Sequence, residues 1–197
     1  MQIDKIILMD TITEKSWQPR KTATEYWLET FPTIEVRMNE AGHFVDEGEI
    51  LVTNGFNGCT TLIVRAEVPK GKVRGFLAHK HADPRRIEEF VTDLEHGELP
   101  PDTKLYGTVL YAGDQYGRSL SEESEKLQQQ LQQRLKARFG NQWQQLRSAR
   151  YAVYEGFPGS VNSNRLVYNV AANMWLHREG ANDQEHPLSG LLKWDNK

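Results

Sequence analysis

The chain has 197 residues, of which 38% are hydrophobic, and a formal net charge of −3 at pH 7. No linker rich in Pro, Gly or Ser divides it, so this length predicts a single domain over residues 1–197. The negative mean hydropathy and the lack of a long apolar run exclude an integral membrane protein, and the small negative charge disfavours nucleic acid as a partner.

The beginning of the chain, MQIDKIILMD, predicts a first β-strand. It is too short and too acidic for a signal peptide. The single cysteine, Cys59, cannot form a disulfide within the chain, which fits a reducing compartment. We therefore expect a cytoplasmic protein, or one that is delivered into the cytosol of a target cell.

A short helix and several strands follow. Residues 22–30 predict a helix that ends before Pro32. Apolar and polar residues alternate over residues 34–38, which is typical of a half-buried strand. After a turn at residues 39–42, strands are predicted at the positions that follow it, residues 43–46 and 49–53.

A hairpin is predicted around the cysteine. Residues 60–64 are rich in β-branched side chains, residues 73–78 form a second, apolar run, and the segment Pro69–Gly71 between them forms a turn. Cys59 begins the first run and His79 follows the second, so the hairpin is expected to bring them together. An imidazole within hydrogen-bond reach of a thiol can withdraw its proton and make the sulfur a nucleophile.

A structural role for the cysteine competes with this hypothesis, because a lone buried cysteine is a common core residue. The residues before it favour the chemical role. Asn54, Gly55, Asn57 and Gly58 permit unusual backbone angles and close approach, which suits backbone N–H groups exposed around a reaction centre.

The pattern of Thr53, then Asn57-Gly58-Cys59-Thr60-Thr61, with Phe76-Leu77-Ala78-His79 closing the next strand, resembles the Cys/His protein-glutamine deamidases. This family includes the catalytic domain of cytotoxic necrotizing factor toxins, toxins of the Burkholderia lethal factor type and the chemoreceptor deamidase CheD. The resemblance covers about thirty residues of the chain. It implies a two-layered β core with helices packed outside.

The resemblance also implies roles for individual residues. Cys59 matches the nucleophile, His79 the base, and Thr53, six positions before the cysteine, the residue that orients the histidine. Backbone N–H groups at Gly58 and Cys59 are the expected oxyanion donors.

Two departures from the family pattern leave alternatives open. Asn57 stands where the toxins have serine, and it is a candidate for substrate contact, as is His81. The interval of twenty residues from Cys59 to His79 is longer than expected for the family, so His81 remains a second candidate for the base.

The implied activity is cofactor-free hydrolysis of a glutamine side chain within a partner protein, by a bacterial toxin or effector. Two alternatives stay open: a non-catalytic interaction protein of the same fold, and a transferase or peptidase that uses the same pair. His79 and His81 could imitate a pair of metal ligands, but no third ligand with suitable spacing is evident, so no metal site is expected.

The rest of the chain predicts helices and strands in a mixed order. Asp83 is a good N-cap and Pro84 a good first residue for a helix that ends at Gly97. The further predicted elements are a strand beside the hairpin at 105–112, a long helix at 119–139, a helical turn or two at 141–147, strands at 149–155 and 165–176, and a loosely held tail at 178–197. His177, at the end of the last strand, is a possible further neighbour of the cysteine. The order predicts an α+β fold with a mixed or mainly antiparallel sheet.

Overall fold

The computed structural model describes residues 23–55, 58–112, 122–151, 165–178 and 185–186. The strand predicted for the first ten residues lies outside this part, as do Asn57 and most of the tail.

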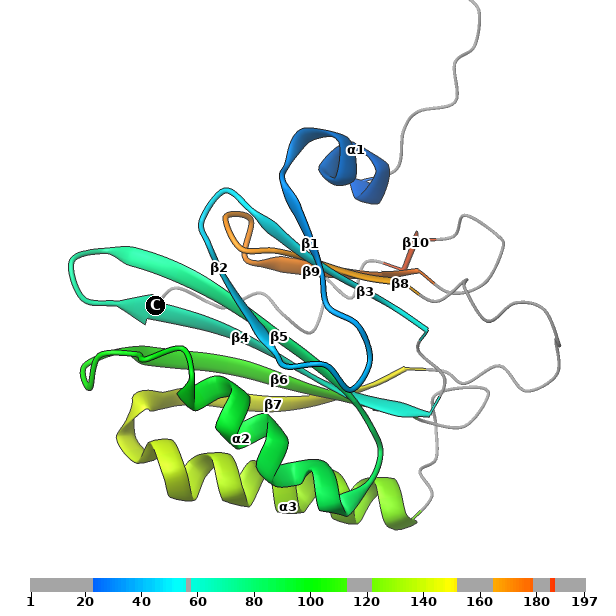
Figure 1. The fold of residues 1–197 in the computed structure, drawn as a ribbon, viewed down its shortest axis with the longest axis vertical. Helices are drawn as coiled ribbons and strands as arrows, with labels where there is room; N and C mark the ends of the chain where they lie inside the picture. Colours follow the sequence, from blue (N-terminus) through cyan, green and yellow to red (C-terminus); the bar gives the residue numbers. More distant parts are fainter. Residues whose placement is uncertain (1–22, 56–57, 113–121, 152–164, 179–184, 187–197) are drawn as a thin grey trace, which may run out of the picture.

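The described strands form two five-stranded sheets that are stacked face to face (Figure 1). The first sheet has the order β1 (Thr33–Glu35), β3 (Ile50–Asn54), β8 (Arg165–Asn169), β9 (Met174–Arg178) and β10 (Glu185–His186). The second has the order β2 (His43–Asp46), β5 (Lys72–His81), β4 (Cys59–Val68), β6 (Lys104–Ala112) and β7 (Trp143–Tyr151). Neighbouring strands are antiparallel except for the parallel pairs β1–β3 and β6–β7. The predicted α+β class with a two-layered, mainly antiparallel core is therefore confirmed.

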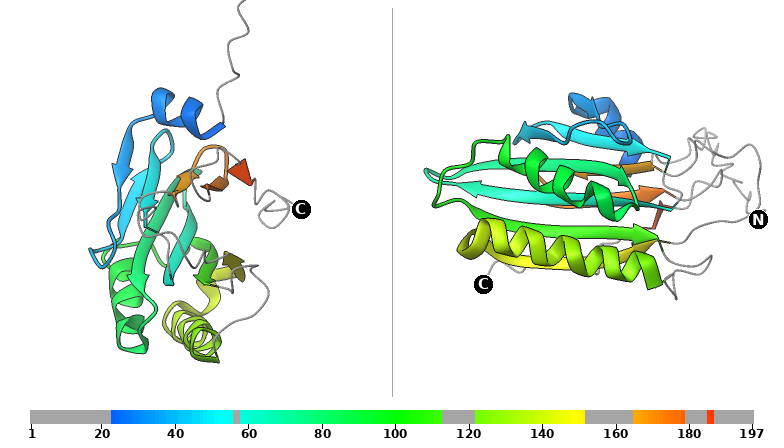
Figure 2. Two further views of the ribbon diagram at one scale, coloured as in Figure 1. Left: turned by 90° about the vertical axis from the view of Figure 1, so that its right-hand side faces the viewer. Right: turned by 60° about the horizontal axis from the view of Figure 1, so that its bottom comes forward.

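Three hydrophobic clusters hold the layers together. Leu51, Leu166 and Tyr168 of the first sheet pack between the sheets against Ile63 and Leu77 of the second. The outer face of the first sheet is covered by α1 (Ala23–Thr30), and the outer face of the second by α2 (Ile87–Glu95) and α3 (Glu122–Phe139), as Figure 2 shows. The predicted packing of helices outside a β core is therefore confirmed.

The hairpin of β4 and β5 is present and is longer than predicted. Its register runs from the pair Cys59 and His81 to the pair Val68 and Lys72. Lys70 and Gly71 turn the chain with φ angles of 73° and 77°, and glycine adopts this left-handed region without strain. Strand β6 pairs with β4, as expected for a strand beside the hairpin. The turn lies at one end of the sheet, so Cys59 lies at the other end (Figure 1).

Two predicted elements are wrong. Residues 141–147 are not helical beyond a single turn at η2 (Gly140–Gln142), because β7 begins at Trp143 and pairs in parallel with β6. The ladder with β6 overrides the helical preference of this glutamine-rich stretch. Trp143 still anchors the segment, since its Nε1 donates to the Leu135 carbonyl at 3.0 Å.

The single strand predicted at 165–176 is a hairpin of β8 and β9. The Asn169 side chain accepts from the Ala172 amide at 2.9 Å, and Asn173 has a left-handed φ of 50°, so the chain reverses between them. Both asparagines are turn residues here.

The helix predicted after the hairpin is preceded by a 3₁₀ turn, η1 (Pro84–Arg86). The Asp83 carboxylate caps it by accepting from the Arg85 amide at 2.9 Å, which confirms the predicted cap. Within the described residues, no helix is both long and apolar enough to cross a membrane.

Candidate functional site

The start of β4 and the ends of β5 and β3 lie at the end of the sandwich opposite the turn between β4 and β5. Cys59 begins β4, while His79 and His81 lie near the end of β5. Cys59 is directly opposite His81, and His79 is two positions further along. Because opposite residues and residues two apart share a face, all three side chains belong to one face of the sheet. Ile63 continues this face into the core between the sheets, so Cys59 and His79 point toward the first sheet.

Thr53, near the end of β3, reaches His79 from the first sheet. Its Oγ1 is 2.7 Å from Nδ1 of His79, and both side chains are buried. If the ring nitrogen donates this hydrogen bond, Nε2 is the nitrogen that carries the lone pair. The contact expected between Thr53 and the imidazole is therefore present, and it spans the two sheets.

Burial strongly affects the protonation of His79. Removal of the imidazole from water, together with repulsion from nearby His81, lowers the pKa of His79 from 6.5 to about 4. His79 is therefore neutral at physiological pH, as a general base must be before it accepts a proton.

This low pKa predicts an acid-dependent loss of stability. Between pH 6.5 and 4 the unfolded chain binds a proton at His79 that the folded chain does not, so the free energy of unfolding falls as the pH drops through this window. The full effect is about 3 kcal/mol. Urea denaturation of wild type and His79→Gln at several pH values measures it.

In His79→Gln this part of the pH dependence should disappear. His43→Ala, which removes an exposed histidine from β2, should retain it. An identical pH dependence in wild type and His79→Gln would contradict the assigned pKa.

Cys59 is only 1% exposed. Its Sγ lies 3.3 Å from Sδ of Met38, toward which the thiol donates. Met38 itself is 38% exposed. The nucleophile candidate therefore lies just below the surface, in contact with a flexible side chain that reaches solvent.

His81 differs from His79 in its surroundings. Its side chain is exposed, and its backbone N–H donates to Asn39 Oδ1 at 3.0 Å. Backbone pairing places His81 directly opposite Cys59, whereas His79 is diagonal to it. Both histidines thus remain within the neighbourhood of the thiol, but His79 is the one whose ring is held by Thr53.

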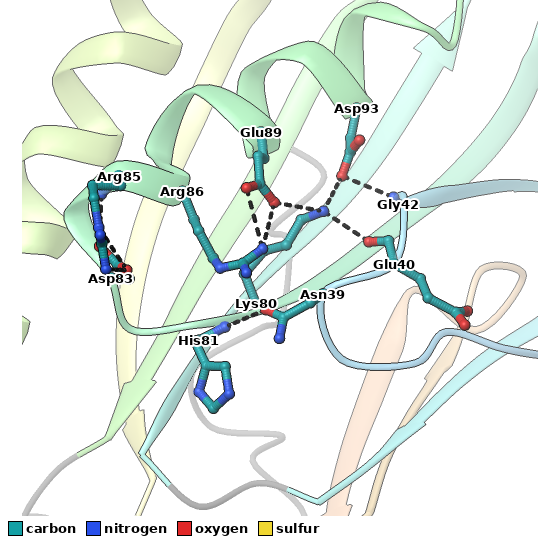
Figure 3. Close-up of polar contacts among 10 residues, drawn as sticks. All are labelled: Asn39, Glu40, Gly42, Lys80, His81, Asp83, Arg85, Arg86, Glu89 and Asp93. Carbon is teal, nitrogen blue, oxygen red and sulfur yellow. Dashed lines mark hydrogen bonds and ion pairs between the residues drawn. The ribbon is translucent and has the colours of Figure 1, made fainter.

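A short segment, residues 39–42, crosses the end of β5 and is called the strap here. Asn39 donates its backbone N–H to the His79 carbonyl at 2.8 Å. The Glu40 carbonyl accepts from Lys80 Nζ at 2.7 Å, and the Gly42 N–H donates to Asp93 Oδ2 at 2.9 Å (Figure 3). The strap is therefore tied to the strand that carries both histidines.

Lys80 is the centre of this anchorage. It lies on the opposite face of β5 from His79, is 2% exposed, and places Nζ 2.7 Å from Asp93 and 3.5 Å from Glu89 of α2 (Figure 3). Glu89 also pairs with Arg86 at 3.0 Å. The ion pairs join α2 to β5, and the hydrogen bonds of Lys80 to Glu40 and of Gly42 to Asp93 attach the strap to both, behind the candidate site.

Sequence reasoning missed Met38, Lys80 and Asp93. Lys80 lies between two histidines near a predicted strand end, where a charged side chain is normally expected in solvent. Asp93 lies within a predicted helix at a position where an exposed polar residue is expected. Only the packing of α2 on the second sheet brings their charges together.

The other predicted site residues are only partly defined. Gly58 is exposed and has a φ of 78°, a conformation that favours glycine just before the cysteine. Asn57 lies outside the described residues. In the first sheet, Leu166 of β8 lies opposite His177 of β9 on one side and opposite Thr53 of β3 on the other.

In the part of the chain that the structure describes, no group of three or more His, Cys, Asp or Glu residues is arranged to hold a metal ion. Comparison with known proteins gives no family: no protein-family model matches the chain, and no curated protein is significantly similar to it.

Proposed function

We propose that this protein is a cofactor-free amidohydrolase that deamidates glutamine side chains in another protein, with Cys59 as nucleophile and His79 as base. The observation that carries the proposal is the 2.7 Å contact between Thr53 Oγ1 and His79 Nδ1, on the same sheet face as Cys59. A cysteine, a histidine and a residue that orients the histidine form the general arrangement of an activated thiol nucleophile.

The low pKa of His79 shapes the mechanism. A buried imidazole whose pKa is about 4 resists carrying a positive charge at rest, so His79 is neutral before the reaction begins. The proton then moves to His79 as the sulfur attacks the carboxamide carbon. The protonated imidazole returns that proton to the departing ammonia, and water hydrolyses the thioester to glutamate.

The remaining groups have supporting roles in this proposal. The backbone N–H groups of Gly58 and Cys59 stabilise the oxyanion, and Thr53 fixes the tautomer of His79. His81 and Asn57 contact the substrate around the reacting side chain. The resemblance of residues 57–61 and 76–79 to the protein-glutamine deamidases implies a folded protein as the substrate. A free glutamine lacks the remote contacts that would position it.

The test is incubation of wild type and Cys59→Ala with bacterial and host-cell lysates, followed by mass spectrometry for conversion of glutamine to glutamate. We expect specific sites to convert with wild type alone, and free glutamine to remain unchanged. Conversion of free glutamine at a comparable rate would contradict the protein substrate. Equal conversion by Cys59→Ala would remove the cysteine from the mechanism.

One observation favours a second candidate, a non-catalytic interaction protein in which Cys59 is a core residue. The thiol is 1% exposed and packs against a thioether, as an inert core cysteine would. Alkylation of the native protein at neutral pH separates the two candidates. An active thiol reacts with iodoacetamide in the folded state, whereas an inert one reacts only after unfolding.

A further inference from the structure

Met38 connects the buried thiol with the surface. Its Sδ lies 3.3 Å from Cys59 Sγ, and its side chain is 38% exposed while that of Cys59 is 1% exposed. A group that approaches Sγ from the side of Met38 must displace the thioether that now contacts it. Methionine is unbranched and has three rotatable side-chain bonds, so this side chain can turn aside at low cost.

The backbone that follows Met38 is fixed. Asn39 donates to the His79 carbonyl at 2.8 Å and accepts from the His81 N–H at 3.0 Å. Glu40 accepts from buried Lys80 at 2.7 Å. Met38 immediately precedes the anchored strap, so its flexible side chain can move over the thiol while the strands that carry Cys59 and His79 stay in place.

We infer that Met38 is a specificity-determining residue of the Cys59 site: it covers the thiol, turns aside to admit a slender unbranched group, and excludes bulky ones. A glutamine side chain is such a slender group, and this identification of the substrate rests on the proposed function. The control of access depends only on the contact between Met38 and Cys59.

The probes are iodoacetamide and its bulky fluorescein derivative, which react by the same chemistry. The sulfur forms a bond to carbon, the carbon–iodine bond breaks, iodide leaves, and the thiol proton passes to the buffer. Cys59 is the only cysteine in the chain, so the alkylation measured is that of the site.

Rates are compared in wild type, Met38→Ala, Met38→Leu and Tyr26→Ala. Met38→Ala should raise the rate with the bulky reagent about tenfold, which corresponds to a cost of about 1.4 kcal/mol for opening the cover, and the rate with iodoacetamide by less. Met38→Leu keeps the bulk without the sulfur and should remain close to wild type. Tyr26→Ala, which shortens another exposed apolar side chain, should change neither rate.

An unchanged or lower rate for Met38→Ala with the bulky reagent would overturn the inference, as would an equal rise for both reagents. Matching urea denaturation curves of Met38→Ala and wild type exclude a rise through unfolding. If no lysate protein is deamidated but Met38→Ala still shows the size-dependent rise, the proposed function fails and the access role stands. If lysate proteins are deamidated but Met38→Ala is alkylated at the wild-type rate, the access role of Met38 fails and the proposed function stands.

Discussion

Replacing His79 by alanine should lower the rate of glutamine deamidation by about 10² to 10⁴, the usual contribution of a positioned general base. It should also slow the alkylation of native Cys59 by iodoacetamide. In the proposed mechanism His79 accepts the thiol proton, and Thr53 contacts its ring across the two sheets. Mass spectrometry of the substrate and of the alkylated protein measures both effects.

His81→Ala is the matched control. It removes the same side chain from the same face of the same strand, but from an exposed position directly opposite Cys59. The alkylation rate should stay near that of wild type. The opposite pattern, with a slow His81→Ala and a normal His79→Ala, would transfer the role of the base to His81.

A second variant, His79→Gln, separates the loss of the base from a loss of folded structure. His79→Gln keeps a polar group that can contact Thr53 but cannot act as a base near neutral pH. It should be as inactive as His79→Ala while unfolding at a urea concentration closer to that of wild type. Substantial activity in His79→Gln would show that positioning at residue 79 matters and proton transfer does not.

Replacing Lys80 by methionine should destabilise the folded protein by about 3–5 kcal/mol, because it leaves a buried carboxylate without its cation. Nζ of Lys80 lies 2.7 Å from Asp93, which is itself nearly buried, and 2.7 Å from the Glu40 carbonyl. Methionine has a similar length and keeps the apolar stem of lysine, so the loss reports on the charge. Urea denaturation monitored by tryptophan fluorescence measures the free energy of unfolding.

Arg85→Met is the control for this prediction. Arg85 pairs with Asp83 at the same 2.7 Å, but its side chain is 89% exposed, so water replaces the lost contact and stability should change little. Adding Asp93→Leu to Lys80→Met removes the stranded charge and should restore part of the loss. Equal effects of Lys80→Met and Arg85→Met would contradict the assignment of a buried ion pair.

Local sequence patterns predict most of the secondary structure that surrounds the site. A run rich in β-branched residues before Pro69–Gly71 and an apolar run after it specify the hairpin of β4 and β5, because strand preference and local turn chemistry agree there. The same is true of the Asp83 cap and of α3. Sequence reasoning failed at residues 141–147 and 170–173, where a ladder with β6 and a turn stabilised by an asparagine side chain decide the conformation.

The sequence also singled out Cys59, His79 and Thr53, since their types and spacing carry the chemical signal. Only the tertiary structure decided their arrangement. The contact of Thr53 with His79 requires two different sheets to stack in one register, and the lowered pKa of His79 arises from burial between them. The contact of Met38 with the Cys59 thiol and the ion pair of Lys80 with Asp93 join residues from different elements of the fold. Such contacts depend on how the layers pack, which no local pattern encodes.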